Sequence, residues 1–432
     1  MPPTRPAGLD STSFRAYWAG EATALAGSSL HAVALPVLAV LELGATPGQV
    51  SLLTAAATTP AFVLALPAGV LGDRYAKKPL MVATDLAAAA VVSAVPLCWA
   101  AGELSMPVLY VVALLLGALT VLHQAAAIAI VPELVTRDQL PAAHSRISAA
   151  NAVADTAGIY GGTLLIGLAG AARVLWLDCL SYLISACLAA RIRPARPSQP
   201  ANDQPVRMLT AIRAGLSYVL RDPIQRPLLL MTTAHAFADY IVITYYAYTL
   251  LTELDAGSIG MGAVMGVAGA GGLVGALAWP RLAARYGPGP LVMTGILSHS
   301  ACTIPLLLAE PGPVWLTVLA TAGFVKTAGA VAAGSTQRAL RQLLCPPHLQ
   351  SRAQQTSVWL VAGIRPLAAL TAGAIAAAFG VKEALLAGTV LYLIPVALLW
   401  ASPVRHLTAM PSAPAGPAIH PPPTPTKERH VR

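Results

Sequence analysis

Long apolar runs separated by short polar connections follow one another along almost the whole chain. Each run is close to the roughly 20 residues that a helix needs to cross a bilayer core about 30 Å thick. The runs are too long for β-strands and do not alternate with a period of two, which argues against a transmembrane β-barrel. The pattern predicts an all-α membrane protein with twelve transmembrane helices, at 16–42, 48–71, 79–101, 105–131, 147–169, 171–191, 227–252, 257–279, 289–310, 313–336, 354–380 and 384–402.

One longer polar segment divides the twelve runs into two groups of six. It opens with a Pro-rich stretch and continues with Leu209, Ile212, Leu216 and Val219 at helical spacing, which predicts an amphipathic helix on the cytoplasmic membrane surface. The expected domains are a cytoplasmic N-terminus (1–15), an N-terminal six-helix bundle (16–191), this cytoplasmic linker (192–226), a C-terminal six-helix bundle (227–402) and a disordered Pro-rich cytoplasmic tail (403–432).

The two halves resemble each other at corresponding connections. The fourth run leads into "VPELVTRDQLPAAHSR" and the tenth into "LRQLLCPPHLQSRAQ", and both are basic and contain Pro. Repeated halves of this kind are typical of secondary transporters.

The basic residues lie almost entirely on one side of the predicted helices. Of the 27 Lys and Arg residues, only Arg173 and Lys382 lie in or beside odd-numbered connections, and only Lys326 and Arg365 lie deep inside runs. Cytoplasmic connections carry an excess of Lys and Arg, so both termini are predicted to be cytoplasmic in a multi-pass protein of the cell membrane. The net charge of +9 thus reflects topology, which argues against nucleic-acid binding.

Composition and motifs argue against an enzyme. The chain is 56% hydrophobic and only 10% charged, against roughly 25% charged residues in soluble domains. The five Cys form no CxxC pair, the histidines show no HExxH spacing, and no GxxxxGK[ST] motif is present. Crowded glycines in "GVAGAGG" (266–272) lie within an apolar run and predict a close helix-packing face rather than a dinucleotide loop. We therefore expect neither a cofactor nor a metal site.

The connection between the second and third runs is unusually rich in charge. It reads GVLGDRYAKK over 69–78. This stretch resembles the signature hairpin of the major facilitator superfamily, G-x-L-x-D-[RK]-x-G-x-[RK]-[RK], with Ala76 where the family has Gly. Alanine would cost more than glycine if this position had a positive φ. The resemblance covers nearly all of 14–400 and implies two pseudo-symmetric six-helix bundles.

The resemblance also implies that this hairpin is a conformational latch rather than a substrate site. Asp73 would lie near the N-terminal end of the eleventh helix, and Asp85 would pair with basic residues of the hairpin. Asp73→Asn is therefore expected to slow turnover more than it weakens substrate binding. The reverse pattern in paired binding and transport assays would contradict this role. The residues assigned to the latch are Gly69, Asp73, Arg74, Lys77, Lys78 and Asp85.

Four less specific sequence patterns resemble those of the macrolide-efflux and enterobactin-exporter-like permeases. They are "FRAYWAG", "LDCLSYLISA", "GLSYVLRDP" and "PLAALTAGAIAAAFG". Antiporters of the superfamily often carry G-P-x-x-G-G in the fifth helix, whereas this chain has Gly161 and Gly162 with Gly158 in place of the Pro. The departure weakens an argument for antiport from this motif and leaves a role in helix packing.

Ionisable residues inside the runs are the candidates for transport, because each costs about 2.5–3.5 kcal/mol or more at a bilayer centre. We expect Asp239 to pair with Lys326 or Arg365. Asp155, His31 or Glu21 would carry a proton or hold a cationic group in the first half, since carboxylates in a low dielectric and histidines can exchange protons. For these groups and His123, the alternative to a role in transport is an interhelical hydrogen bond or buried pair that fixes helix packing. This structural interpretation is the favoured one for His235, His299 and Asp178. The predicted substrate and proton pathway comprises Asp239, Lys326, Arg365, His31, Asp155, Glu21 and His123.

The function expected is proton-coupled efflux of a small amphipathic organic molecule. Export rests on the resemblance to one branch, and the charges do not fix the direction. The alternative is an importer or facilitator of an anionic metabolite held by Lys326 and Arg365. A non-transporting membrane sensor is disfavoured by the signature hairpin and the charged runs. We expect a monomer in the lipid bilayer whose partners are protons and a small-molecule substrate.

Overall fold

The structure is a computed structural model. It describes the backbone of residues 8–74, 76–193, 216–345 and 350–409, and within these ranges some side chains of 65–74, 137–159 and 342–356 lie outside the description. The described residues form helices and contain no strand. The expected all-α architecture is thus confirmed for this part of the chain.

The N-terminal half consists of six long helices joined by short connections. Each overlaps one predicted apolar run. In chain order they are α1 (Thr12–Leu41), α2 (Pro47–Arg74), α3 (Lys77–Ala101), α4 (Met106–Leu134), the 3₁₀ turn η1 (Arg137–Gln139), α5 (Leu140–Ala169) and α6 (Ala171–Arg191).

The C-terminal half repeats this arrangement with three of its runs divided. A five-residue π-helical turn continues α8, and the runs predicted at 289–310 and 384–402 each form two consecutive helices. The elements are α8 (Gln225–Tyr248), η2 (Thr249–Glu253), α9 (Gly257–Tyr286), α10 (Pro288–Ala301), α11 (Ile304–Leu308), α12 (Pro313–Leu344), α13 (Gln350–Phe379), α14 (Val381–Leu391), α15 (Leu393–Trp400) and η3 (Pro403–His406).

The helix boundaries differ most from the apolar runs at the end of the molecule near the chain termini. There α5 begins at Leu140 rather than at 147, and α12 continues to Leu344 rather than stopping at 336. The added turns are polar or basic, as in "PAAHSR" and "TQRALRQ". Helices in this protein therefore continue past the apolar segment, which hydropathy alone cannot detect.

Ten segments of the described chain are long and apolar enough to cross a membrane. Helices α2 and α5 are not among the ten. They are 28 and 30 residues long and occupy the second and fifth predicted positions. Crossing by these two helices, and with it the total of twelve, stays a prediction.

The linker and the tail differ from expectation where the structure describes them. In the linker, 216–221 is helical, and Val219 is fully buried against Leu229 and Cys345 rather than facing a membrane. The tail does not begin as disordered chain at Pro403, because η3 buries Val404 completely and the carbonyl of Leu407 accepts a hydrogen bond from Gly289 N at 2.9 Å. The other residues of the predicted amphipathic helix before 216, and the tail from 410, lie outside the described residues.

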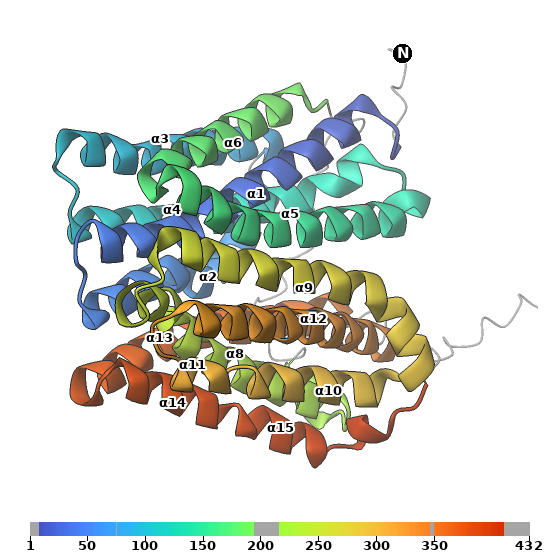
Figure 1. Cartoon of the computed structure of the whole chain (residues 1–432). Coiled ribbons are helices and arrows are strands. Elements are labelled where there is room, and N and C mark those ends of the chain that lie inside the picture. Colours follow the sequence, from blue (N-terminus) through green and yellow to red (C-terminus); the bar gives the residue numbers. More distant parts are fainter. Residues whose placement is uncertain (1–7, 75, 194–215, 346–349, 410–432) are drawn as a thin grey trace, which may run out of the picture.

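The two halves form two layers of helices packed against each other, coloured blue to green and yellow-green to red in Figure 1. They meet mainly where α2 packs on α13 and α5 packs on α9. In the first seam the rings of Phe62 and Trp359 stack with centroids 5.3 Å apart, and Trp359 Nε1 donates to the Phe62 carbonyl. Near the end opposite the termini, Tyr245 OH donates to the carbonyl of Pro47 at 3.0 Å.

Glycines let several helices approach closely, as predicted for the stretch 266–272. A Cβ at Gly271 would overlap the carbonyl oxygen of Phe324, so α9 and α12 pack backbone to backbone there. On α5, a Cβ at Gly158 would lie 2.6 Å from Ser29 Cβ, and one at Gly162 would lie 2.5 Å from Leu30 Cδ2. Both therefore pack on α1, whereas a Cβ at Gly161 would have open space.

Gly271→Val is expected to force α9 and α12 apart. The carbonyl of Phe324 belongs to a helix backbone and cannot rotate away, so the cost should reach or exceed the about 1–3 kcal/mol typical of overpacking. Thermal unfolding of the purified protein in detergent would measure the loss. Gly266→Ala is the matched control on α9, because no atom lies within 4 Å of its Cβ position. Equal stability of the two variants would contradict this packing.

Candidate functional site

A buried charge cluster lies in the C-terminal half, centred on Asp239 of α8. Its Oδ1 lies 3.6 Å from Lys326 Nζ on α12 and 3.1 Å from His299 Nε2 on α10. Tyr392, between α14 and α15, donates its hydroxyl to the same oxygen at 2.7 Å. Three segments thus place donors around one carboxylate of a fourth. The predicted pairing of Asp239 with Lys326 is present.

The protonation of His299 follows from its contacts. Its Nε2 faces the Asp239 carboxylate, whereas its buried Nδ1 has no hydrogen-bond partner among the described residues. A neutral ring with the proton on Nε2 satisfies this arrangement, because imidazolium would leave a second N–H unpaired. With Asp239 and Lys326 both charged, the cluster is then neutral overall. The ring of His235 packs edge-on against His299, with centroids 4.5 Å apart.

The cluster opens onto a cavity of about 300 Å³. Asp239, Lys326 and His299 line it together with mainly apolar residues of α8, α9 and α12. One lining residue, Tyr160, comes from α5 of the other bundle and lies directly on Gly269, where a Cβ would overlap its ring. An apolar wall with a few convergent polar groups is the usual composition of a small-molecule pocket.

A second cluster lies in the N-terminal half, where His123 of α4 lies between two carboxylates. Its Nε2 is 2.7 Å from Glu21 Oε1 on α1, and its Nδ1 is 2.9 Å from Asp85 Oδ1 on α3. Both ring nitrogens therefore face acceptors. Either the ring is imidazolium and donates twice, or one carboxyl group carries a proton. We call Glu21, Asp85 and His123 the acidic triad; it lines a separate cavity of about 310 Å³.

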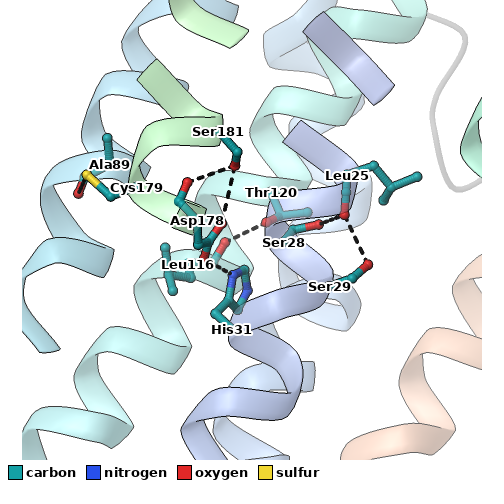
Figure 2. A network of polar contacts seen from close by, with 10 residues as sticks. All are labelled: Leu25, Ser28, Ser29, His31, Ala89, Leu116, Thr120, Asp178, Cys179 and Ser181. Carbon is teal, nitrogen blue, oxygen red and sulfur yellow. Dashed lines mark hydrogen bonds and ion pairs between the residues drawn. The ribbon is translucent and has the colours of Figure 1, made fainter. Parts of the chain in front are cut away.

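A third polar cluster joins α1 to α6, and Figure 2 shows it from close by. His31 Nδ1 lies 2.8 Å from Oδ2 of the completely buried Asp178. Ser181 Oγ donates to the Asp178 carbonyl at 2.7 Å and approaches its Oδ1 at 3.5 Å. Gly27 permits this approach, because a Cβ there would overlap Ser181 Oγ.

The sequence matches the transmembrane secretion effector family over residues 4–429. The chain belongs to this family of major facilitator transporters. It is 26% identical over 383 residues to the protein named multidrug efflux pump Tap of Mycobacterium tuberculosis, a match that covers 84% of this chain and 87% of that one. The protein of the same name from Mycolicibacterium fortuitum is 26% identical over 378 residues, with 84% and 89% covered.

Solved structures of major facilitator transporters show the same fold. The nucleoside transporter NupG superposes with a TM-score of 0.68 at 12% identity, covering 90% of this chain and 97% of that one. An inward-facing, occupied bacterial homologue of the lysosomal transporter Spinster gives 0.63 at 13% identity, covering 90% and 95%. The family membership confirms a multi-pass membrane transporter with a small-molecule substrate in a lipid bilayer, and a protein that is not an enzyme.

Other predicted pathway residues of this transporter lie apart from the clusters. The Arg365 guanidinium on α13 lies over the ring of Tyr240, 5.1 Å from its centroid, and pairs with no carboxylate among the described side chains. The other expected partner of Asp239 is thus not in contact with it. Helix α5 includes Asp155, whose side chain is outside the described residues.

The hairpin of the major facilitator signature is described only in part. Lys77 Nζ pairs with Glu133 Oε1 of α4 at 3.0 Å, and Lys78 lies half-buried in the first turn of α3. Gly69, Asp73 and Arg74 lie on α2, with side chains outside the description. Ala76 has a φ of −63°, so replacing the family's glycine causes no backbone strain here.

Two placements in this transporter differ from the sequence analysis. Asp85 does not contact the basic residues described in the hairpin, because its carboxylate lies against His123 of α4. His299 contacts Asp239 of α8 directly, in agreement with the interhelical pairing favoured for it. Tyr392 was not considered at all, since a tyrosine in an apolar run gives no charge signal.

Proposed function

We propose that this transporter is a proton-coupled exporter of small amphipathic organic molecules that works by alternating access. The observation that carries the proposal is the acidic triad, a buried group that can hold one or two protons at hydrogen-bond distance beside a cavity. The name of the Mycobacterium tuberculosis relative, a multidrug efflux pump, supports efflux of organic compounds. Rigid-body rocking of two bundles about a shared site is typical of secondary transporters, and here Tyr160 of α5 and residues of the C-terminal bundle line one cavity together.

The proton step uses the two states of the triad. With both carboxylates ionised, the His123 ring must be imidazolium to donate to both, and the net charge is −1. Loss of the proton leaves two carboxylates beside a neutral ring and a net charge of −2 in a low dielectric, which is unfavourable. The triad therefore favours proton uptake on the acidic side of the membrane. It releases the proton only when other interactions offset the cost of the second net negative charge.

The orientation of the transporter in the membrane follows from the distribution of its basic residues. Both termini lie in the cytoplasm of a cell-membrane protein, and the contact of Tyr245 with Pro47 lies toward the outer face. The hairpin between α2 and α3 acts as the latch on the cytoplasmic side. The Lys77–Glu133 ion pair ties the start of α3 to α4 and so fixes this end of the hairpin within the N-terminal bundle.

The alternative, transport of an anionic metabolite held by Lys326 and Arg365, is less well supported. Asp239 already neutralises Lys326. The acidic triad would repel an anion, and of Lys326 and Arg365 only Arg365 has no carboxylate partner among the described side chains. The charges of the described part therefore favour neutral or cationic substrates.

The test uses inside-out membrane vesicles with an acidic lumen and a panel of fluorescent cationic, neutral and anionic amphipathic compounds. We expect saturable uptake of cationic or neutral compounds, accompanied by proton efflux from the lumen and abolished by a protonophore. Vesicles lacking the protein are the control. Saturable uptake that is indifferent to the pH gradient would reject proton coupling, and selective uptake of anions would support the alternative.

A further inference from the structure

The ammonium group of Lys326 in the cavity of the C-terminal bundle has donors to spare. It carries three N–H groups, and its nearest acceptor, Asp239 Oδ1, lies 3.6 Å away. That separation is longer than the about 2.7–2.9 Å of a charge-assisted hydrogen bond, and Nζ donates to no other described residue. The side chain is 20% exposed and lines the cavity, so a molecule in the cavity can accept from it.

The neighbouring carboxylate of Asp239 is occupied on one oxygen only. Oδ1 accepts from Tyr392 and faces His299 and Lys326. Oδ2 makes no hydrogen bond to a described residue, and it is not enclosed, because the side chain is 27% exposed and lines the cavity. A free donor and a free acceptor therefore lie next to each other in one wall of this cavity.

The net charge of this wall limits what can bind to it. The charges of Asp239 and Lys326 cancel, and the contacts of His299 keep its ring neutral. No other described lining residue is Asp, Glu, Lys, Arg or His. A cationic ligand would meet the ammonium of Lys326 and an anionic ligand the carboxylate of Asp239, and each would add a net charge inside the membrane. An uncharged group that both donates and accepts avoids this cost.

The remaining wall specifies the body that carries such a group. Tyr160 of α5 and Tyr246 of α8 contribute aromatic rings, and Met265, Leu306 and Leu319 are among the apolar residues. Aromatic side chains pack well against flat aromatic molecules. The cavity of about 300 Å³ lies at the lower end of the range for ligand pockets, which favours a small ring system.

We infer that the cavity of the C-terminal bundle binds uncharged aromatic molecules that carry a carboxamide group. The carbonyl of the ligand accepts from Lys326 Nζ, and its N–H donates to Asp239 Oδ2. A carboxamide has this acceptor and this donor on neighbouring atoms, so it bridges the ion pair without replacing either member. The inference rests on the proposed function and specifies one substrate class of the exporter, with Lys326 and Asp239 as the residues that determine specificity.

The test is equilibrium dialysis of the purified full chain in detergent against two tritiated probes, 2-naphthamide and methyl 2-naphthoate. The two share a naphthyl body and a carbonyl, but the ester has no N–H. Micelles without protein correct for partitioning. We expect the amide to bind about tenfold or more tightly than the ester, as for one additional hydrogen bond to a charged group. Equal affinities, or tighter binding of the ester, would overturn the inference.

A native cysteine reports where the amide binds. Cys302, at the end of α10, lines this cavity, whereas Cys187 of α6 is exposed and does not. Saturating 2-naphthamide should slow alkylation of Cys302 by N-ethylmaleimide, read by peptide mass spectrometry, and leave alkylation of Cys187 unchanged. The anion 2-naphthoate and the cation 2-naphthylmethylamine should protect Cys302 less at the same concentration. Stronger protection by either charged probe, or none by the bound amide, would overturn the site.

The double variant Asp239→Asn, Lys326→Met ties the preference to these two side chains. The ratio of amide to ester affinity should fall to about threefold or less, because neither hydrogen bond is charge-assisted any longer. The control Lys382→Met removes an exposed lysine of α14 and should keep the wild-type ratio. An unchanged ratio in the double variant would overturn the site. Should that variant not fold, the two probes and Cys302 on the wild type still decide.

Vesicle transport separates this inference from the proposed function. Proton-coupled uptake of amphipathic compounds without preferential binding of the amide would reject the substrate class and leave the proposed function standing. Preferential amide binding at Cys302 without proton-coupled uptake would support the site and reject the coupling.

Discussion

Asp239→Asn is expected to abolish transport and to lower the stability of the protein. The substitution keeps the shape of the side chain but leaves the Lys326 ammonium without its carboxylate, with Tyr392 and His299 facing a weaker acceptor. Removing one partner of a fully buried pair costs about 3–5 kcal/mol, but these side chains are 27% and 20% exposed to the cavity, so about 1–3 kcal/mol is the reasonable expectation. Thermal unfolding in detergent and vesicle uptake measure the two effects.

The double variant Asp239→Asn, Lys326→Met separates a transport role from a packing role. Both charges are absent, so stability should return to near the wild-type value because no unpaired charge remains. Transport should stay lost if the pair acts on the substrate or in the conformational change. Recovery of transport together with stability would show that the pair only fixes the packing of α8 against α12.

His123→Gln is expected to remove the response of transport to a pH gradient. Glutamine can still donate a hydrogen bond to Glu21 or Asp85, but it cannot carry the proton that both carboxylates require of the imidazole. One carboxyl group of the triad should then remain protonated on both sides of the membrane, so the group no longer cycles. Initial rates of uptake with and without an imposed gradient should become equal.

The control for this prediction is His406→Gln. His406 is exposed in η3, accepts a hydrogen bond from Arg405 and lines neither cavity. Its replacement should leave both the rate and the response to pH as in the wild type. A His123→Gln protein that still accelerates when the gradient is imposed would exclude His123 as the proton carrier.

The helices could be predicted from the sequence because membrane crossing imposes a length of apolar chain that is visible locally. The run 171–191 coincides with α6 at both ends, and the glycine-rich stretch in α9 is a packing face as expected. The ends of α5 and α12 could not be predicted in this way, because their added turns are polar and are held by neighbouring helices.

The candidate site was predictable only in part because pairing between helices depends on their rotation and depth. Asp239 and Lys326 were expected to meet since each is an isolated charge deep in its run. The acidic triad was not found, because Asp85 was assigned to the hairpin. Its position eight residues after Lys77, about 12 Å along a helix, was a signal that it lies well inside the bundle.

Tyr160 gives the cavity of the C-terminal bundle a wall that belongs to the other bundle. An occupant of that cavity would therefore touch both bundles at once. In the proposed alternating-access cycle, separation of α5 from α9 would lift the tyrosine off Gly269 and remove one side of the cavity in the same movement. Opening of the seam would then expose the occupant without a separate lid.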